Sequence, residues 1–162
     1  MKINKKGFSL TELLATIIII AIVIAIAVPA VSNYIETSRR KSYVSSAFAY
    51  IKSVRNYASA YKYRFTNSEA VYYLPVECIE MHKKTPSPYG EYIEAYVVVI
   101  TDGTNPEYYW TSYDKTGHGM ELTQEKEIKQ DSIIINKFSI DKNIPVKGRM
   151  VLIEMNKDTC EF

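Results

Sequence analysis

The chain has 162 residues, of which 47% are hydrophobic and 23% are charged, and its net charge is +2. This length allows one domain with a modest core and one added element, and the composition excludes a disordered chain. Sixteen acids and ten bases follow residue 64, whereas seven bases and two acids lie in residues 8–64. A balance this close to neutral excludes a dedicated nucleic-acid binder, although the basic stretch could form a local patch.

The N-terminal region begins with a short basic segment, Met1–Gly7, which contains three lysines and no acid. From Leu13 to Ile35, 23 residues follow one another without a charge. As a helix, this stretch would be roughly 35 Å long, against about 30 Å for the hydrocarbon core of a bilayer. The pattern predicts a membrane-spanning helix; a buried core helix of a soluble protein is the alternative.

The helical pattern continues past the apolar run to about Tyr61. Apolar residues recur at steps of three and four, and these are Val31, Tyr34, Ile35, Val44, Ala47, Phe48, Ile51, Val54 and Ala58. The other face is basic, with Arg39, Arg40, Lys41, Lys52, Arg55, Lys62 and Arg64. We therefore expect one helix over residues 8–62, apolar all round over 8–35 and amphipathic over 36–62.

Pro29 lies inside this predicted helix. An interior proline removes one backbone hydrogen bond and clashes with the preceding turn, which costs on the order of 3 kcal/mol. We expect a kink or a local loosening at Pro29. The alternative is that Pro29 marks the end of a membrane segment.

Residues 63–162 are predicted to form a β-rich globular head. Runs rich in Tyr, Val and Ile alternate with Pro, Gly and Asp turn signals. The predicted strands are Val71–Val76, Ile93–Ile100, Tyr108–Tyr113, Ile133–Ile140 and Met150–Met155. The second and third should pair as a hairpin. The fold class is therefore α+β, a long kinked helix packed on an antiparallel sheet of four or five strands.

The chain contains two cysteines, Cys78 and Cys160. In an exported domain an even count permits one disulfide, and the sequence leaves the bonded and the free state open.

The most specific pattern is Gly7-Phe8-Ser9-Leu10-Thr11-Glu12, which follows Lys5-Lys6 and precedes the apolar run. A secretory signal or a plain membrane anchor would explain the basic start and the apolar run. Neither explains Glu12, because a carboxylate costs about 2.5–3.5 kcal/mol at the centre of a bilayer and is still unfavourable near its end.

This pattern resembles the class III signal of type IV prepilins and pseudopilins. The resemblance covers about 25 residues; the rest of the chain matches only in layout, and Ala21 stands where many pilins have a glycine. It implies cleavage after Gly7, methylation of the new N-terminus at Phe8, and a role for Glu12 in assembly. Pro29 matches the helix-breaking proline of the family. No enzymatic activity and no cofactor are expected.

The resemblance also implies a function and partners. The chain would be a structural subunit that polymerises with itself, after a prepilin peptidase has cut it, through a platform protein and ATPase machinery. Before assembly it would be a single-pass membrane protein in contact with lipid, its N-terminus cytoplasmic. Afterwards it would lie in an extracellular pilus for motility, adhesion or DNA uptake. A minor pilin, a pseudopilin of a secretion or competence system, and a secreted binding protein starting at Val28 or later are the alternatives.

Weaker signals have ordinary explanations. His82 and His118 lie far apart in predicted loops and form no metal-ligand spacing. Asp102, Glu107 and Asp114 could surround Ca²⁺, but turn-forming roles are favoured and no metal is expected. No nucleophile triad occurs. The 14 tyrosines are interpreted as β-formers; an aromatic strip for adhesion or nucleic-acid contact is a further hypothesis, which no motif supports.

Overall fold

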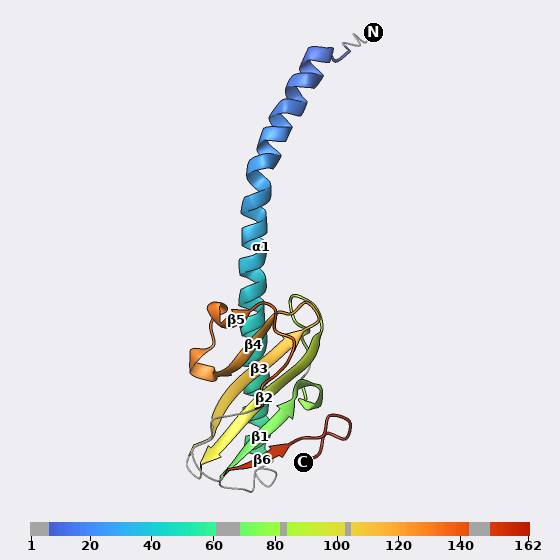
Figure 1. The fold of residues 1–162 in the computed structure, drawn as a ribbon. Coiled ribbons are helices and arrows are strands. Elements are labelled where there is room, and N and C mark those ends of the chain that lie inside the picture. The colour runs from blue at the N-terminus through green and yellow to red at the C-terminus, as the bar shows by residue number, and fades with distance from the viewer. Residues whose placement is uncertain (1–6, 61–68, 82–83, 103–104, 143–149) are drawn as a thin grey trace. The chain divides into compact units, whose positions relative to one another are not determined.

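A computed structural model of the chain describes residues 7–60, 69–81, 84–102, 105–142 and 150–162. Within these residues the helix α1 spans Leu10–Ala60. The strands are β1 (Glu69–Pro75), β2 (Tyr92–Asp102), β3 (Glu107–Asp114), β4 (Gly119–Gln124), β5 (Ile133–Ile134) and β6 (Val151–Glu154) (Figure 1). Three 3₁₀ turns are η2 (Val76–Cys78), η3 (Glu125–Glu127) and η4 (Gln130–Ser132). The predicted α+β arrangement of one long N-terminal helix and a sheet is confirmed.

The chain divides into two compact units, Met1–Ser38 and Arg39–Phe162. We call the second one the head unit. It contains the sheet and also the part of α1 that follows Ser38. The predicted boundary between helix and head, at residues 62 and 63, lies outside the described residues.

The sheet has the strand order β5-β4-β3-β2-β1-β6. The predicted hairpin is present as β2 and β3, with Val97 opposite Trp110. Every neighbouring pair is antiparallel except β1 and β6, which run parallel. The prediction of a wholly antiparallel sheet is therefore wrong in this one pair, because β6 joins the edge opposite β5 instead of continuing the meander.

Two strand predictions need correction. The predicted strand Ile133–Ile140 shrinks to Ile133–Ile134, since Asn136 has a φ of 65° and breaks the extended backbone. The strand β4 was not predicted, because its first residue, Gly119, was interpreted as part of a turn. Gly119 lies so close to β3 that an added Cβ would sit 2.4 Å from the carbonyl oxygen of Ser112. Only glycine allows this approach.

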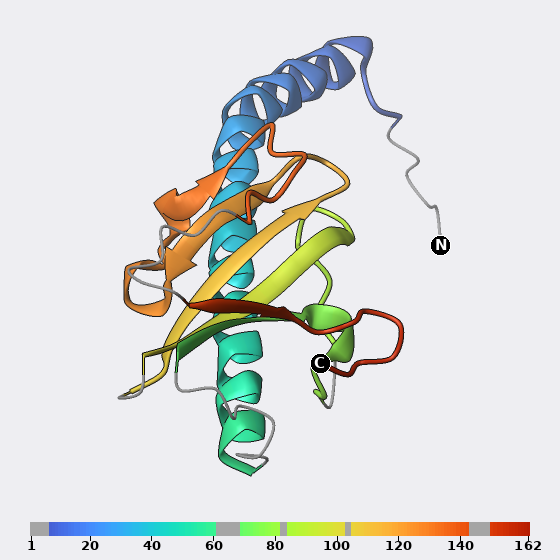
Figure 2. The ribbon, with the colours of Figure 1, turned by 60° about the horizontal axis from the view of Figure 1, so that its bottom comes forward.

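One hydrophobic core lies between the head part of α1 and the sheet (Figure 2). Tyr43, Ala47 and Ile51 on the helix are 0% exposed. Tyr50 stacks on Trp110 of β3, with 5.5 Å between ring centroids. The predicted apolar stripe was partly wrong: it omitted Tyr43 and Tyr50 and included Phe48, which is 39% exposed.

A second, smaller core covers the opposite face of the sheet. Val71, Tyr73, Tyr96 and Val98 are buried there, with the partly buried Ile140 packed against them. The adjacent Tyr72 belongs to the first core, so these neighbouring tyrosines point to opposite faces of the sheet and both are buried. Because Tyr73 and Tyr96 are buried as well, they cannot contribute to a surface aromatic strip.

A disulfide joins Cys78, in η2, to Cys160 near the C-terminus, and 5.2 Å separates their Cα atoms. The bridge closes a loop with a sequence separation of 82. By the loop-closure argument such a bridge stabilises the fold by up to about 4–5 kcal/mol.

Candidate processing and assembly site

Gly7, Phe8 and Ser9, the described residues before α1, are open to solvent. Gly7 has no neighbouring atom within 4 Å of an added Cβ, and Phe8 is 77% exposed. Neither residue belongs to the helix, which begins at Leu10. The peptide bond between Gly7 and Phe8 therefore lies in accessible, non-helical chain, as cleavage by a peptidase requires.

The first turn of α1 is closed by two reciprocal hydrogen bonds. The Ser9 amide donates to Glu12 Oε2 at 2.9 Å, and the Glu12 amide donates to Ser9 Oγ at 3.2 Å. This is a capping box, in which the N-cap side chain and the third residue of the helix satisfy each other's backbone donors. The sequence interpretation missed Ser9, although the Ser-x-x-Glu spacing before an apolar run signals this motif.

The capping box fixes the position of the Glu12 carboxylate. It is held back toward the start of the helix, where a negative charge also interacts favourably with the helix dipole. Its second oxygen, Oε1, has no hydrogen-bond partner among the described residues. Glu12 can therefore keep its bond to Ser9 and still accept a hydrogen bond from another positive group.

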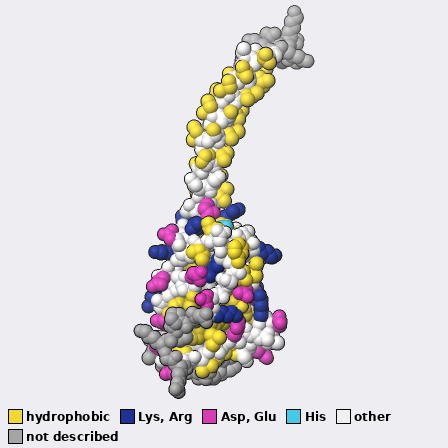
Figure 3. Space-filling view, in the orientation of Figure 1, with side chains coloured by type: hydrophobic (Ala, Val, Ile, Leu, Met, Phe, Trp, Pro, Cys, Tyr) yellow, Lys and Arg dark blue, Asp and Glu magenta, His cyan; other side chains and the backbone are white. Residues whose placement is uncertain are grey.

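The apolar segment that follows, Leu13–Ile35, is exposed along its whole length (Figure 3). Its large aliphatic side chains from Ile17 to Ile24 are each 52–61% exposed. Among the described residues, α1 is the helix with the length and composition to cross a membrane. An apolar surface of this size needs lipid or another protein around it.

The polar side chains of the apolar segment bond to the helix's own backbone. Thr16 Oγ1 donates to the Leu13 carbonyl at 2.8 Å, and Ser32 Oγ donates to the Val28 carbonyl at 3.0 Å. These hydroxyls are thereby satisfied without water, as a lipid environment demands. α1 continues through Pro29, whose missing N–H leaves one carbonyl without its helical partner. The kink at Pro29 stays a prediction.

A family model of the prokaryotic N-terminal methylation motif matches residues 2–28. The chain carries the class III signal of type IV pilin-like proteins. The match includes Gly7, Phe8 and Glu12 and ends just before Pro29. Among curated proteins and among solved structures, none matches the chain. The motif supports a type IV pilin-like or pseudopilin protein, a structural family whose members are usually non-enzymatic.

The three acids considered for Ca²⁺ do not come together. Glu107 and Asp114 are the first and last residues of β3, so they lie at opposite ends of an eight-residue strand. Asp114 is fully buried and accepts hydrogen bonds from the Ser87 hydroxyl at 2.6 Å and from the Thr116 amide at 2.9 Å. It organises a turn. Asp102, at the end of β2, is exposed.

Of the two histidines considered as metal ligands, the structure describes His118. His118 stacks on Tyr89, with 3.8 Å between ring centroids, and its Nδ1 lies 2.7 Å from Thr116 Oγ1. His82 lies outside the described residues.

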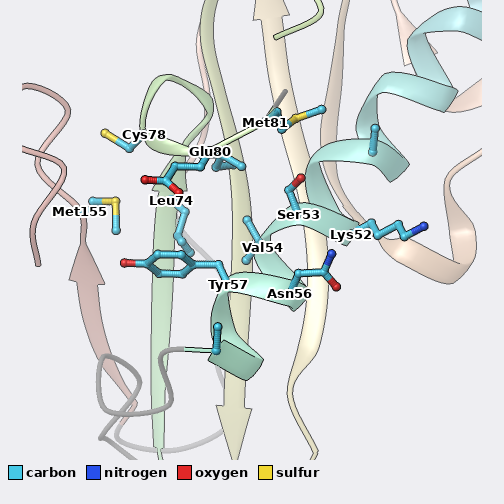
Figure 4. A pocket seen from close by; sticks show the side chains of 13 residues that line it. Lys52, Ser53, Val54, Asn56, Tyr57, Leu74, Cys78, Glu80, Met81 and Met155 are labelled. Atoms are coloured by element: carbon cyan, nitrogen blue, oxygen red, sulfur yellow. The ribbon is translucent and has the colours of Figure 1, made fainter. Parts of the chain in front are cut away.

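A cavity of about 580 Å³ lies beside the C-terminal part of α1 (Figure 4). Its wall is mainly apolar, with Leu74, Ile79, Met81 and Met155 facing Val54 and Tyr57 of the helix. Lys52 and Glu80 are the charged lining residues.

Proposed function

We propose that the chain is a structural subunit of a type IV pilus, which polymerises through its N-terminal helix after cleavage and methylation. A prepilin peptidase cuts between Gly7 and Phe8 on the cytoplasmic side. The apolar segment stays on the mature protein and anchors it. A platform protein and an ATPase then extract the subunit into a helical filament with other copies of itself.

The observation that carries this proposal is the Glu12 carboxylate directly before the charge-free, exposed apolar segment Leu13–Ile35. A lone carboxylate in lipid is costly, and the cost falls when a cation pairs with it. Cleavage creates such a cation at the Phe8 amine. The free Glu12 Oε1 of an incoming subunit can accept a hydrogen bond from the Phe8 amine of its neighbour, which would set the axial register of the filament. The exposed Ile and Val side chains supply non-directional packing.

The test is Glu12→Val in cells with the complete assembly machinery. We expect the variant to stay in the membrane fraction and to be cleaved, with loss of filaments in sheared preparations. Glu12→Asp is the matched control, because it keeps the charge and should retain part of the assembly. N-terminal mass spectrometry of the mature protein should give methylated Phe8. Normal filaments from Glu12→Val would refute the proposal, and a mature start at Val28 or later would favour a secreted protein.

The abundance of the chain in the sheared preparations also distinguishes a major pilin from a minor pilin or a pseudopilin. A major pilin should dominate the sheared filaments, whereas a minor pilin or a pseudopilin should be scarce in them. Glu12→Val should block assembly in each case, because the pairing with a neighbouring amine does not depend on what the head binds.

A further inference from the structure

The head unit carries exposed basic and apolar side chains close to the residue where the chain enters it. The guanidinium carbon of Arg39, the first residue of this unit, lies 5.8 Å from the ring centroid of Tyr89. Tyr89 stacks in turn on His118, and the planes of the two rings are nearly parallel, with an angle of 3° between them. Arg39 therefore lies beside the turn between β3 and β4.

Exposed apolar side chains adjoin the same turn. An added Cβ at Gly117 would lie 2.7 Å from Phe138 Cζ, so the Phe138 ring covers Gly117, next to His118. Phe138 is nevertheless 63% exposed, and Ile135 is 58% exposed. Large aromatic and aliphatic side chains with this exposure, so close together, mark a surface that contacts something apolar.

We call this region the collar surface. It consists of Arg39, Arg40, Lys41, Tyr89, His118, Ile135 and Phe138.

The collar surface is also basic. Arg39 and Lys41 are exposed, and Arg40 Nη1 donates to the Gln130 carbonyl at 3.3 Å. Of the nearby acids, Glu91 is paired with Lys115. Asp131, next to Gln130, is exposed and offset in charge by the exposed Lys129.

The collar surface lies within reach of the lipid headgroups. The apolar segment ends at Ile35, four residues before Arg39. Four residues span at most about 14 Å even when fully extended. The headgroup layer on each side of the hydrocarbon core is roughly 5–8 Å thick. If Ile35 lies at the edge of the hydrocarbon core, the Arg39 backbone lies at most about 14 Å from that edge, so the long Arg39 side chain can reach the phosphate layer.

We propose that the collar surface docks on anionic lipid headgroups while the subunit waits in the membrane. Arg39 and Lys41 bind phosphates, and the Phe138 and Ile135 side chains enter the boundary between headgroups and acyl chains. Basic and apolar side chains on one surface are the combination that membrane-surface elements use. The inference rests on the proposed membrane-anchored subunit. It adds that extraction into a filament must first release the head from the lipid.

The experiment uses the full chain in nanodiscs that hold one copy, made of phosphatidylcholine with or without phosphatidylglycerol. Trp110, the single tryptophan, is 0% exposed and gives a constant background. Phe138→Trp places a probe on the collar surface. Leu152→Trp is the matched control, because Leu152 is 54% exposed on β6, at the edge of the sheet opposite β5. Quenching by lipids with a nitroxide headgroup reports contact with the membrane surface.

We expect strong quenching at position 138 and weak quenching at position 152, and we expect the difference to grow with phosphatidylglycerol and to shrink in high salt. In the Phe138→Trp background, Arg39→Gln with Lys41→Gln should lower the ratio of docked to undocked heads on the order of tenfold. Lys52→Gln with Lys126→Gln removes two exposed charges elsewhere on the head unit and should leave the quenching unchanged.

Two results would overturn the docking. One is equal quenching at positions 138 and 152 in both lipid mixtures. The other is quenching at position 138 that needs two copies in a disc, which would assign the collar surface to contacts between subunits. A chain that does not enter nanodiscs at all would refute the membrane-anchored subunit itself, and docking with it. Anchoring without docking would leave the proposed function standing.

Discussion

The two parts of α1, before and after Ser38, use similar residues in opposite ways. Ile19 is 61% exposed, whereas Ile51 is 0% exposed. The polar side chains of the first part bond to their own helix, as Thr16 and Ser32 do. In the second part Tyr43 bonds to Ser112 of β3, 69 residues away in sequence.

This contrast teaches that helix formation and partner choice are separate properties of the sequence. The second part has its partner within the chain, because the sheet covers its apolar face. The first part forms a complete helix but has no packed partner for its side chains. Its isoleucines from Ile17 to Ile24 are more than half exposed. In the proposed function its partners come from outside the chain, first as lipid and then as other copies.

The largest expected effect comes from one matched pair, Ile51→Ala and Ile19→Ala. Ile51→Ala leaves a cavity in the head core, so the free energy of unfolding of the head should fall by about 2–5 kcal/mol. Ile19→Ala should change it by less than about 0.5 kcal/mol. Denaturant unfolding of the full chain in detergent, followed by Trp110 fluorescence, measures both. Equal losses would show that the two parts of α1 are not independent.

A smaller effect on stability is expected from removing the hydroxyl groups of two tyrosines in the head, Tyr43 and Tyr92, both of which have buried hydroxyls. The Tyr43 hydroxyl lies 2.6 Å from Ser112 Oγ, and Tyr43→Phe should destabilise the head by about 1 kcal/mol. The Tyr92 hydroxyl is buried without a hydrogen-bond partner among the described residues. Tyr92→Phe should therefore be neutral or stabilise the head by up to about 1 kcal/mol. A clear loss of stability in Tyr92→Phe would mean that its hydroxyl is satisfied, for example by a buried water.

Alkaline pH should enlarge the difference in stability between Tyr92→Phe and the unchanged protein. Burial raises the pKa of the Tyr92 hydroxyl well above its ordinary value near 10. The folded head holds Tyr92 neutral while the unfolded chain ionises it, so stability is full below pH 10 and falls as the pH rises above it. Tyr92→Phe removes this loss. Its advantage over the unchanged protein should therefore be larger at pH 10.5 than at pH 7.

The smallest effect concerns the first turn of α1. Ser9→Ala removes one half of the capping box and should cost about 1 kcal/mol of local helix stability. Faster amide exchange at Thr11 and Glu12 would report it, and Ser9→Asp should restore the cap. The head should keep its stability. Filaments should still form, because the Glu12 carboxylate remains; loss of filaments would assign Ser9 a direct part in assembly.

The sequence predicted the helix, the β2–β3 hairpin and the processing motif because each rests on local signals. Long apolar runs and strict motif spacing need no knowledge of distant residues. The face that α1 buries was harder to predict. Tyr43 and Tyr50 are buried because Ser112 and Trp110 of β3 and Tyr89 in the turn before β2 receive them, and these partners lie far along the chain.

The errors in the head have the same origin. A glycine in a strand resembles a turn until its neighbour is known, which is why Gly119 concealed β4. The left-handed backbone at Asn136 ended a strand that its isoleucines favoured. The parallel position of β6 depends on which sheet edge is vacant, and no local pattern encodes that. At the processing site, Ser9 was missed because the methylation signal drew attention to Glu12 alone.

The position of β6 also bears on when the fold can be locked by its disulfide. The last strand in the sequence lies beside the first, and the bridge from Cys78 to Cys160 fastens the segment that carries it. Thiols in a reducing cytosol stay unpaired, so this fastening belongs to an oxidising compartment. The sheet edge at β6 can therefore be covalently locked only when Cys160, which follows β6, meets Cys78 under oxidising conditions.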